Sequence, residues 1–126
     1  KGWTELIRLL NERMGNAPVR RMITTTLKPE LMAHPADREQ FAGKVKRFVD
    51  MVVSQLDDSY VLVRLGLQEF MILDTAGESS AHQAMLKRVV NAYMDAAEEL
   101  TNLPQFKTTL HLDTASPEAM LVNALR

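Results

Sequence analysis

The feature that most constrains the fold of this chain is an apolar periodicity of three and four residues in two long segments. These segments cover about residues 36–56 and 80–100. Apolar residues at such steps share one face of a helix, whereas a strand would require alternation. The residues on these faces are Phe41, Val45, Phe48, Val49, Val52, Val53 and Leu56, and Met85, Leu86, Val89, Val90, Tyr93, Ala96, Ala97 and Leu100. The pattern predicts two long amphipathic helices.

Shorter helices are expected near both ends of the chain. Thr4 is a suitable N-cap for an apolar face over residues 6–14, and Gly15 supplies a C-terminal stop. Pro18 stands where a further helix could begin, and Ser116 followed by Pro117 forms a good helix start. Residues 103–112 give a weaker signal, which we interpret as a short helix.

Residues 60–73 form an apolar stretch whose secondary structure is ambiguous. The β-branched residues Val61 and Val63 favour a strand. Arg64 and Gln68, however, are four positions apart and would share one face of a helix in otherwise apolar surroundings. We therefore predict a helix that is buried on most of its surface.

The composition fits one globular domain and excludes several classes of site. The chain has 126 residues, of which 46% are apolar and 25% charged. It contains no cysteine, which excludes disulfide frameworks, cysteine-based metal sites and thiol nucleophiles. No apolar run approaches the roughly 18 residues that span a bilayer. We predict a soluble intracellular protein, cytoplasmic or nuclear, and the start at Lys1 suggests a fragment of a longer one.

Short strings recur along the chain at similar spacing. Val19–Arg20 recurs as Val63–Arg64, and residues 74–76 recur as residues 113–115 with the sequence Asp-Thr-Ala. Residues Val49–Phe70 resemble a HEAT repeat, in which an apolar helix, a turn Asp and a Val-Arg pair open a second apolar helix. Units of this kind bury their faces by stacking on one another.

The resemblance implies an all-α fold of stacked antiparallel helix pairs, a HEAT-like α-solenoid fragment. A plain helical bundle is the alternative. Residues 1–126 would form a single domain with units at 1–34, 35–77 and 78–126. By the same resemblance, Asp58 and Arg64 would form a structural bridge between repeats, and the second helices would contact a partner. The candidate partner-binding residues are Arg20, Arg21, Lys28, Gln68, Glu69 and Lys107.

No constellation of residues supports catalysis. Residues 73–78 resemble a GTPase switch segment, but the phosphate-binding motif that such chemistry requires is missing. The two Asp-Thr-Ala strings lack the predicted β-structure of aspartic proteases, and we read each as a helix end. His34, His82 and His111 lack metal-ligand spacing, so we expect them in solvent or turn positions, with no metal or cofactor.

These observations predict a non-catalytic interaction scaffold that binds another protein or neighbouring repeats, and no membrane. The alternative is a nucleic-acid-binding helical module. Residues 1–28 carry 6 basic and 2 acidic side chains, a charge of +4, whereas the remainder carries 9 and 14, a charge of −5. Phosphate contacts would then come from the basic end. They would be made by Arg8, Arg13, Arg20, Arg21 and Lys28.

Overall fold

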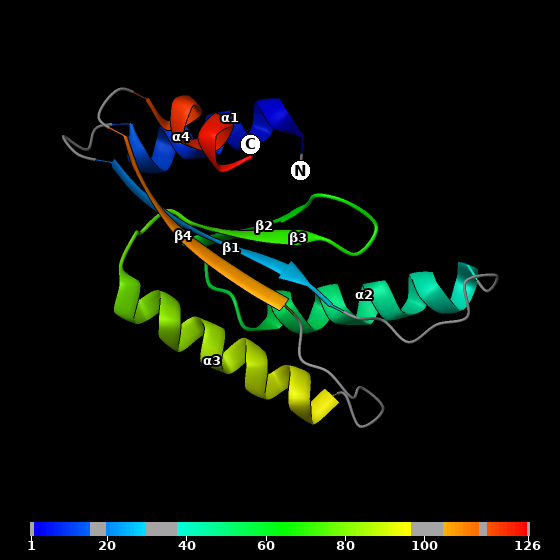
Figure 1. Cartoon of the computed structure of the whole chain (residues 1–126). Coiled ribbons are helices and arrows are strands. Elements are labelled where there is room, and N and C mark those ends of the chain that lie inside the picture. The colour runs from blue at the N-terminus through cyan, green and yellow to red at the C-terminus, as the bar shows by residue number, and fades with distance from the viewer. Residues whose placement is uncertain (1, 16–19, 30–37, 97–104, 114–115, 126) are drawn as a thin grey trace.

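A computed structural model of the chain describes residues 2–15, 20–29, 38–96, 105–113 and 116–125 (Figure 1). The helices are α1 (Trp3–Met14), α2 (Arg38–Ser54), α3 (Ser79–Ala96) and α4 (Pro117–Ala124). The strands are β1 (Arg20–Lys28), β2 (Tyr60–Arg64), β3 (Phe70–Asp74) and β4 (Gln105–Asp113). Within the described residues, the strands form one four-stranded antiparallel sheet in the order β2-β3-β1-β4.

Strand β1 is central in the sheet because it pairs along both edges. On one side its register with β4 runs from Arg20↔Asp113 to Lys28↔Gln105. On the other side it pairs with β3, from Ile23↔Asp74 to Leu27↔Phe70. Three consecutive threonines, residues 24–26, lie in the middle of β1, and β-branched side chains of this kind favour extended backbone.

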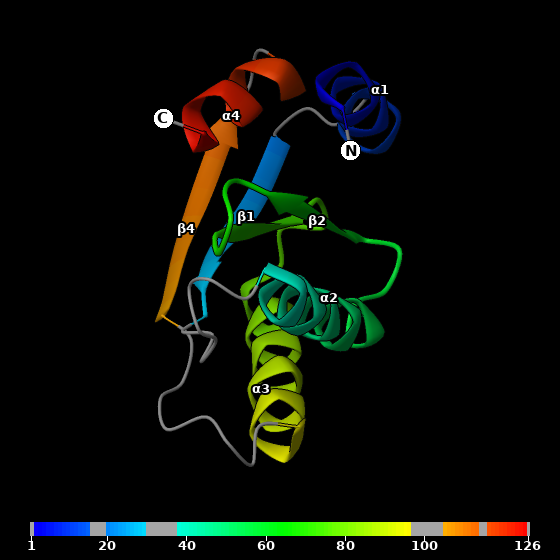
Figure 2. The same cartoon turned by 90° about the vertical axis from the view of Figure 1, so that its right-hand side faces the viewer.

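The helices form a layer on each face of the sheet (Figures 1 and 2). Helices α1 and α4 cover one face, and their core includes Leu6, Leu10, Met14, Met22, Val61, Val63, Met71, Leu73, Met120 and Leu121. Helices α2 and α3 cover the other, and their core includes Leu27, Val45, Phe48, Val52, Tyr60, Phe70, Ile72, Met85, Val89 and Tyr93. Successive residues of a strand point to opposite faces, so β2 and β3 contribute to both cores.

The predicted all-α fold is wrong, and both of its forms, the HEAT-like solenoid and the plain bundle, fail for the same reason. Residues 60–73 form β2, a turn and β3 instead of a buried helix. All five residues of β3 are buried because helices cover both faces of the sheet. A strand covered on both faces is a continuous apolar run, which periodicity alone does not distinguish from a buried helix.

Two further predictions of helix are also wrong. The helix expected after Pro18 is replaced by β1, which begins at Arg20, while Pro18 itself lies outside the described residues. The short helix expected at residues 103–112 is strand β4. The predicted units at 1–34, 35–77 and 78–126 are therefore not helix pairs, because each contains at least one strand.

The four helices predicted from one-sided apolar faces are confirmed. Over the described residues, the segments at 36–56 and 80–100 correspond to α2 and α3. The Ser116 hydroxyl accepts a hydrogen bond from the Ala119 amide at 3.1 Å, so the predicted cap of α4 is also correct. Helix α1 has Gly2 at its N-cap instead of Thr4. Among the described residues, no helix has the length and apolar character to cross a membrane.

Candidate functional site

The turn between β2 and β3 is the first candidate site, because a compact polar framework holds it at the surface. The amides of Leu65 and Gly66 both donate to the carbonyl of Glu69, at 2.8 and 3.1 Å. Leu67 at the tip is 74% exposed, and Glu69 is exposed beside it. We call residues Arg64–Phe70 the β2–β3 hairpin site.

Arg64 fixes the shape of this hairpin site. Its Nε donates to the Gly66 carbonyl at 2.9 Å, and its Nη2 donates to the Leu67 carbonyl at 3.1 Å. The guanidinium carbon lies 5.9 Å from the centroid of the Phe70 ring, a cation–π distance. The exposed Arg64 side chain is thus oriented by three groups of the hairpin itself.

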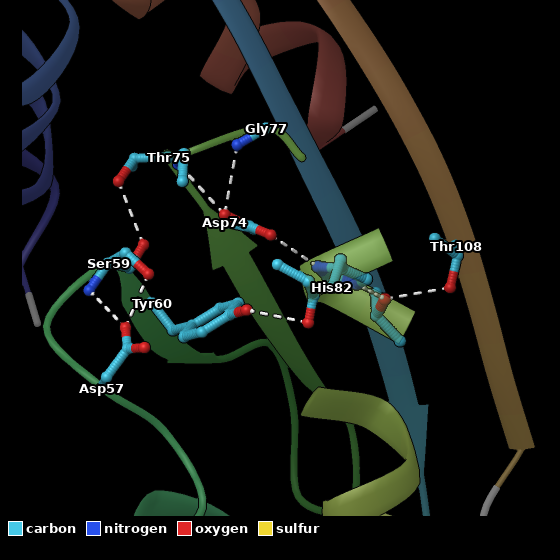
Figure 3. Close-up of polar contacts among 11 residues, drawn as sticks. Asp57, Ser59, Tyr60, Asp74, Thr75, Gly77, His82 and Thr108 are labelled. Atoms are coloured by element: carbon cyan, nitrogen blue, oxygen red, sulfur yellow. Dashed lines mark hydrogen bonds and ion pairs between the residues drawn. The ribbon is translucent and has the colours of Figure 1, made fainter. Parts of the chain in front are cut away.

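A buried polar cluster lies toward the opposite end of β3 (Figure 3). His82 Nδ1 is 2.9 Å from Asp74 Oδ2, and His82 Nε2 is 2.6 Å from the Thr25 hydroxyl. Thr25 Oγ1 is in turn 2.9 Å from Thr108 Oγ1. The remaining carboxylate oxygen of Asp74 accepts the amides of Ala76 at 3.0 Å and Gly77 at 3.2 Å. The cluster therefore connects the β3–α3 turn to β1 and β4.

The order carboxylate, imidazole, hydroxyl in this cluster is the order of a hydrolase triad. Its burial argues for a structural role instead. Asp74 and His82 are each 1% exposed, and Thr25 is 0% exposed. A nucleophile must reach its substrate, and the Thr25 hydroxyl faces two other side chains. The cluster satisfies buried polar groups, as the interior of a protein requires.

Two ionisable groups near the start of β2 have shifted pKa values with clear causes (Figure 3). The pKa of Tyr60 is raised, first by burial and then by the negative charge of Asp74. Its hydroxyl donates to the Ala81 carbonyl at 3.4 Å. The pKa of Asp57 is lowered because its carboxylate accepts hydrogen bonds from the hydroxyl and amide of Ser59, at 2.6 and 2.8 Å. Asp57 thus closes the turn before β2, and Tyr60 connects the start of β2 to α3.

The predicted partner-binding residues lie in separate parts of the molecule. Gln68 and Glu69 lie together in the hairpin site. Arg20 and Arg21 begin β1, whereas Lys28 ends it, so they lie at opposite ends of a nine-residue strand. Lys107 lies in β4 opposite Thr26. The structure thus brings together two of these residues beside Arg64, and the binding role of all of them stays a prediction.

The predicted bridge between Asp58 and Arg64 loses its basis because the chain has no stacked repeats to connect. Asp58 lies in the turn before β2, and Arg64 ends that strand. The expectation for the histidines is wrong for His82, which is buried in α3 against Asp74. His111 is half-buried in β4, 2.9 Å from the Thr24 hydroxyl, and His34 lies outside the described residues. The described part of the chain has no group of three metal-ligating side chains.

Sequence reasoning missed the roles of Asp74 and His82. It interpreted the Asp-Thr-Ala string as a helix end, whereas Asp74 ends β3. One signal was available: an Asp after a short apolar run and three residues before a Gly is typical of a turn closed by the side chain. The hairpin also carried a signal, because Gly66 divides two apolar runs of strand length.

Comparison with known proteins gives a fold likeness and no sequence match. No family model matches the chain, and no curated protein matches its sequence. A solved structure of the GGDEF domain of YfiN from Pseudomonas aeruginosa matches with a TM-score of 0.58 and 18% identity, covering 96% of this chain and 80% of that one. A shortened form comprising only that domain matches with a TM-score of 0.55 and 20% identity, covering 96% and 75%.

An EAL/GGDEF domain protein from M. capsulatus gives a third match, with a TM-score of 0.57 and 9% identity. It covers 95% of this chain and 81% of that one. At these identities the likeness shows the fold. It contradicts the predicted helical-repeat scaffold and the nucleic-acid-binding helical module, because the shared fold is mixed α and β. The prediction of a protein that is not an enzyme is not upheld either, because it rested on the helical-repeat fold that this likeness overturns.

The name of these domains is itself a string of residues that can be compared with this chain. Residues Gly66–Phe70 read G-L-Q-E-F, which agrees with G-G-D-E-F at the first, fourth and fifth positions. In this structure the string occupies the tip of the hairpin site and the first residue of β3.

Proposed function

We propose that this chain is a GGDEF-like domain of cyclic di-GMP signalling that binds a guanine nucleotide at the β2–β3 hairpin site. The observation that carries the proposal is the position of the G-L-Q-E-F string. It forms an exposed turn in a fold that the chain shares with GGDEF domains. Exposed turns held by a rigid sheet are common positions for ligand-binding residues.

The chemistry of the hairpin suits a purine with hydrogen-bond donors on its edge. Glu69 offers an exposed carboxylate, which accepts hydrogen bonds, and guanine carries N–H donors that adenine lacks on the same edge. Gly66 leaves the backbone open to a ligand, and a Cβ built there would meet only the Cβ of Glu69, at 3.8 Å. A larger residue at Gly66 would therefore obstruct a ligand without a clash inside the hairpin.

The test is calorimetric titration of the chain with GTP, cyclic di-GMP and ATP in the presence of Mg²⁺. We expect binding of a guanine nucleotide, weakened about 10-fold or more by Glu69→Gln, in the range of a lost hydrogen bond to a charged group. Gly66→Leu should weaken it as well. Glu118→Gln, which changes an exposed carboxylate in α4, is the matched control. No binding of GTP or cyclic di-GMP at millimolar concentration would refute the proposal.

Turnover distinguishes an enzyme from a nucleotide sensor within this proposal. A diguanylate cyclase joins two GTP molecules into one cyclic di-GMP and releases two pyrophosphates. Incubation with GTP and Mg²⁺ or Mn²⁺, followed by chromatography, would detect both products in a ratio of one to two. Formation of these products that Gly66→Leu abolishes would identify the hairpin site as catalytic, and binding without turnover would identify it as a sensor.

A further inference from the structure

The guanidinium of Arg64 has hydrogen-bonding capacity that the hairpin does not use. An arginine side chain carries five N–H hydrogens. Two of them are engaged, one from Nε to the Gly66 carbonyl and one from Nη2 to the Leu67 carbonyl. Among the described residues, the other three have no protein acceptor within hydrogen-bonding distance. They are the two hydrogens of Nη1 and the second hydrogen of Nη2, and one hydrogen of each nitrogen points outward in parallel from the Nη1–Nη2 edge, which is the free edge of the planar group.

This free edge is already oriented before any ligand arrives. Bonds from two different nitrogens to two carbonyls fix the plane of the guanidinium, and the Phe70 ring lies 5.9 Å from its carbon. An exposed arginine usually loses about 2 kcal/mol of rotamer freedom when a ligand immobilises it. In Arg64 part of this cost is already met within the folded hairpin, which favours affinity.

The positive charge of Arg64 has neutral partners, and this feature points to an anionic ligand. Because carbonyl oxygens are uncharged, they orient the guanidinium without neutralising its positive charge. Arg8 on α1 provides a contrast, because its guanidinium is paired with the carboxylate of Glu12 at 2.7 Å. A planar group that presents parallel N–H donors and an unpaired charge matches the oxygens of a phosphate in a two-pronged contact.

We propose that Arg64 is the phosphate-binding residue of the hairpin site, with its free Nη1–Nη2 edge donating to phosphate oxygens. This inference rests on the proposed nucleotide binding, and it assigns the base and the phosphates of the nucleotide to different residues. Glu69 would contact the base through acceptor oxygens, and Arg64 would contact the phosphates through donor nitrogens. The two carbonyl bonds of Arg64 also make the position of the phosphate depend on the shape of the turn.

The first experiment reads Arg64 directly in the unmodified chain by nuclear magnetic resonance. The probes are sodium tripolyphosphate, which carries only phosphate groups, guanosine, which carries the base and ribose without phosphate, and GTP, which carries both. Tripolyphosphate and GTP should shift the side-chain Nε and Nη resonances of Arg64, and guanosine should leave them unchanged. The backbone amides of Leu65 and Gly66 report whether the turn keeps its shape.

The second experiment compares two variants and a control. Arg64→Gln should weaken the binding of tripolyphosphate and GTP about 10- to 100-fold, the range for a charge-assisted hydrogen bond, and should weaken guanosine binding much less. Arg64→Lys keeps the charge but loses the planar fork, so the loss should be smaller. Arg88→Gln removes an exposed arginine from α3 and should bind like the parent chain.

The outcomes separate this inference from the proposed function. GTP binding that is equal in the parent and in Arg64→Gln, with no shift of the Arg64 resonances, overturns the inference and leaves the proposed function standing. Tripolyphosphate binding at Arg64 without any preference for GTP or cyclic di-GMP supports an anion site and overturns the proposed function. Absence of binding by all probes overturns both.

Discussion

Asp74 illustrates at the residue scale how one buried carboxylate holds several elements in place. It accepts two backbone amides of the β3–α3 turn and the ring N–H of His82, while His82 continues the chain of contacts to β1. A buried carboxylate is costly in the folded state unless such donors surround it. Its contacts explain why residue 74 tolerates a charge inside the core.

Replacement of Asp74 by alanine should therefore cause a large loss of stability. The Asp74→Ala variant leaves two amides and the His82 ring without their acceptor, which should lower the free energy of unfolding by about 3–5 kcal/mol. Urea denaturation followed by circular dichroism measures the change. Asp50→Ala, at an exposed position of α2, should cost less than about 1 kcal/mol. Equal losses in the two variants would contradict the role of Asp74.

Gly77 should be sensitive to the smallest side chain. Its φ of 67° lies in the left-handed region, and a Cβ there would come within 2.7 Å of the Arg21 Cβ and 2.9 Å of the Arg21 carbonyl oxygen. Gly77→Ala should therefore destabilise the fold by about 1–3 kcal/mol. Gly66→Ala, whose Cβ would make only an ordinary contact of 3.8 Å with the Glu69 Cβ, should leave the thermal midpoint nearly unchanged. A stable Gly77→Ala variant would show that the turn relaxes.

His111 should make the stability of the fold depend on pH. Burial lowers its pKa in the folded state, so the unfolded chain binds the proton more readily. The contribution of this residue is constant above the unfolded pKa of about 6.5 and falls as the pH decreases from there through the lowered folded value. Replacement with Gln should reduce the loss of thermal midpoint between pH 7.5 and 5. An unchanged loss would assign the acid sensitivity to other groups.

At the scale of the element, the sequence predicted the helices, whose burial is one-sided. Helices α2 and α3 bury one face against the sheet, so their apolar residues keep a helical period. Strand β3 has helices on both sides, and its period of two disappears in a run of five buried residues. Gln68 and Glu69 were identified as binding candidates, whereas Asp74 and His82 were not, because their contact needs the fold to bring a turn and a helix together.

The two-sided burial of β3 predicts an unusual tolerance pattern. Asp substitutions at Met71 and at the next residue, Ile72, should each prevent folding, because the side chains point into different cores. A strand with one solvent-exposed face would tolerate one of these two substitutions. In β4, Leu112 is 64% exposed, and Leu112→Asp should fold normally. Circular dichroism spectra of the three variants test this, and a folded variant at position 71 or 72 would contradict the layer assignment.

On the scale of the whole molecule, the two cores share one sheet and should unfold together. The ring centroids of Phe48 and Phe70 lie 5.4 Å apart in the core of α2 and α3. The single tryptophan, Trp3, begins α1 on the other face of the sheet. Phe48→Ala should cost about 3–5 kcal/mol. The unfolding midpoint seen by Trp3 fluorescence should fall as far as the midpoint seen by circular dichroism. A fluorescence midpoint that stays unchanged would indicate two independently stable layers.

The pairing of β1 with β4 also has a consequence for the time course of synthesis. The paired residues are 77 positions apart at Lys28↔Gln105 and 93 apart at Arg20↔Asp113, by subtraction of their numbers. A ribosome that adds about 5–20 residues per second makes β4 between about 4 and 15 s after β1. During this interval the nascent chain carries a nine-residue strand with an unpaired edge, which is a target for chaperones and for strands of other nascent chains.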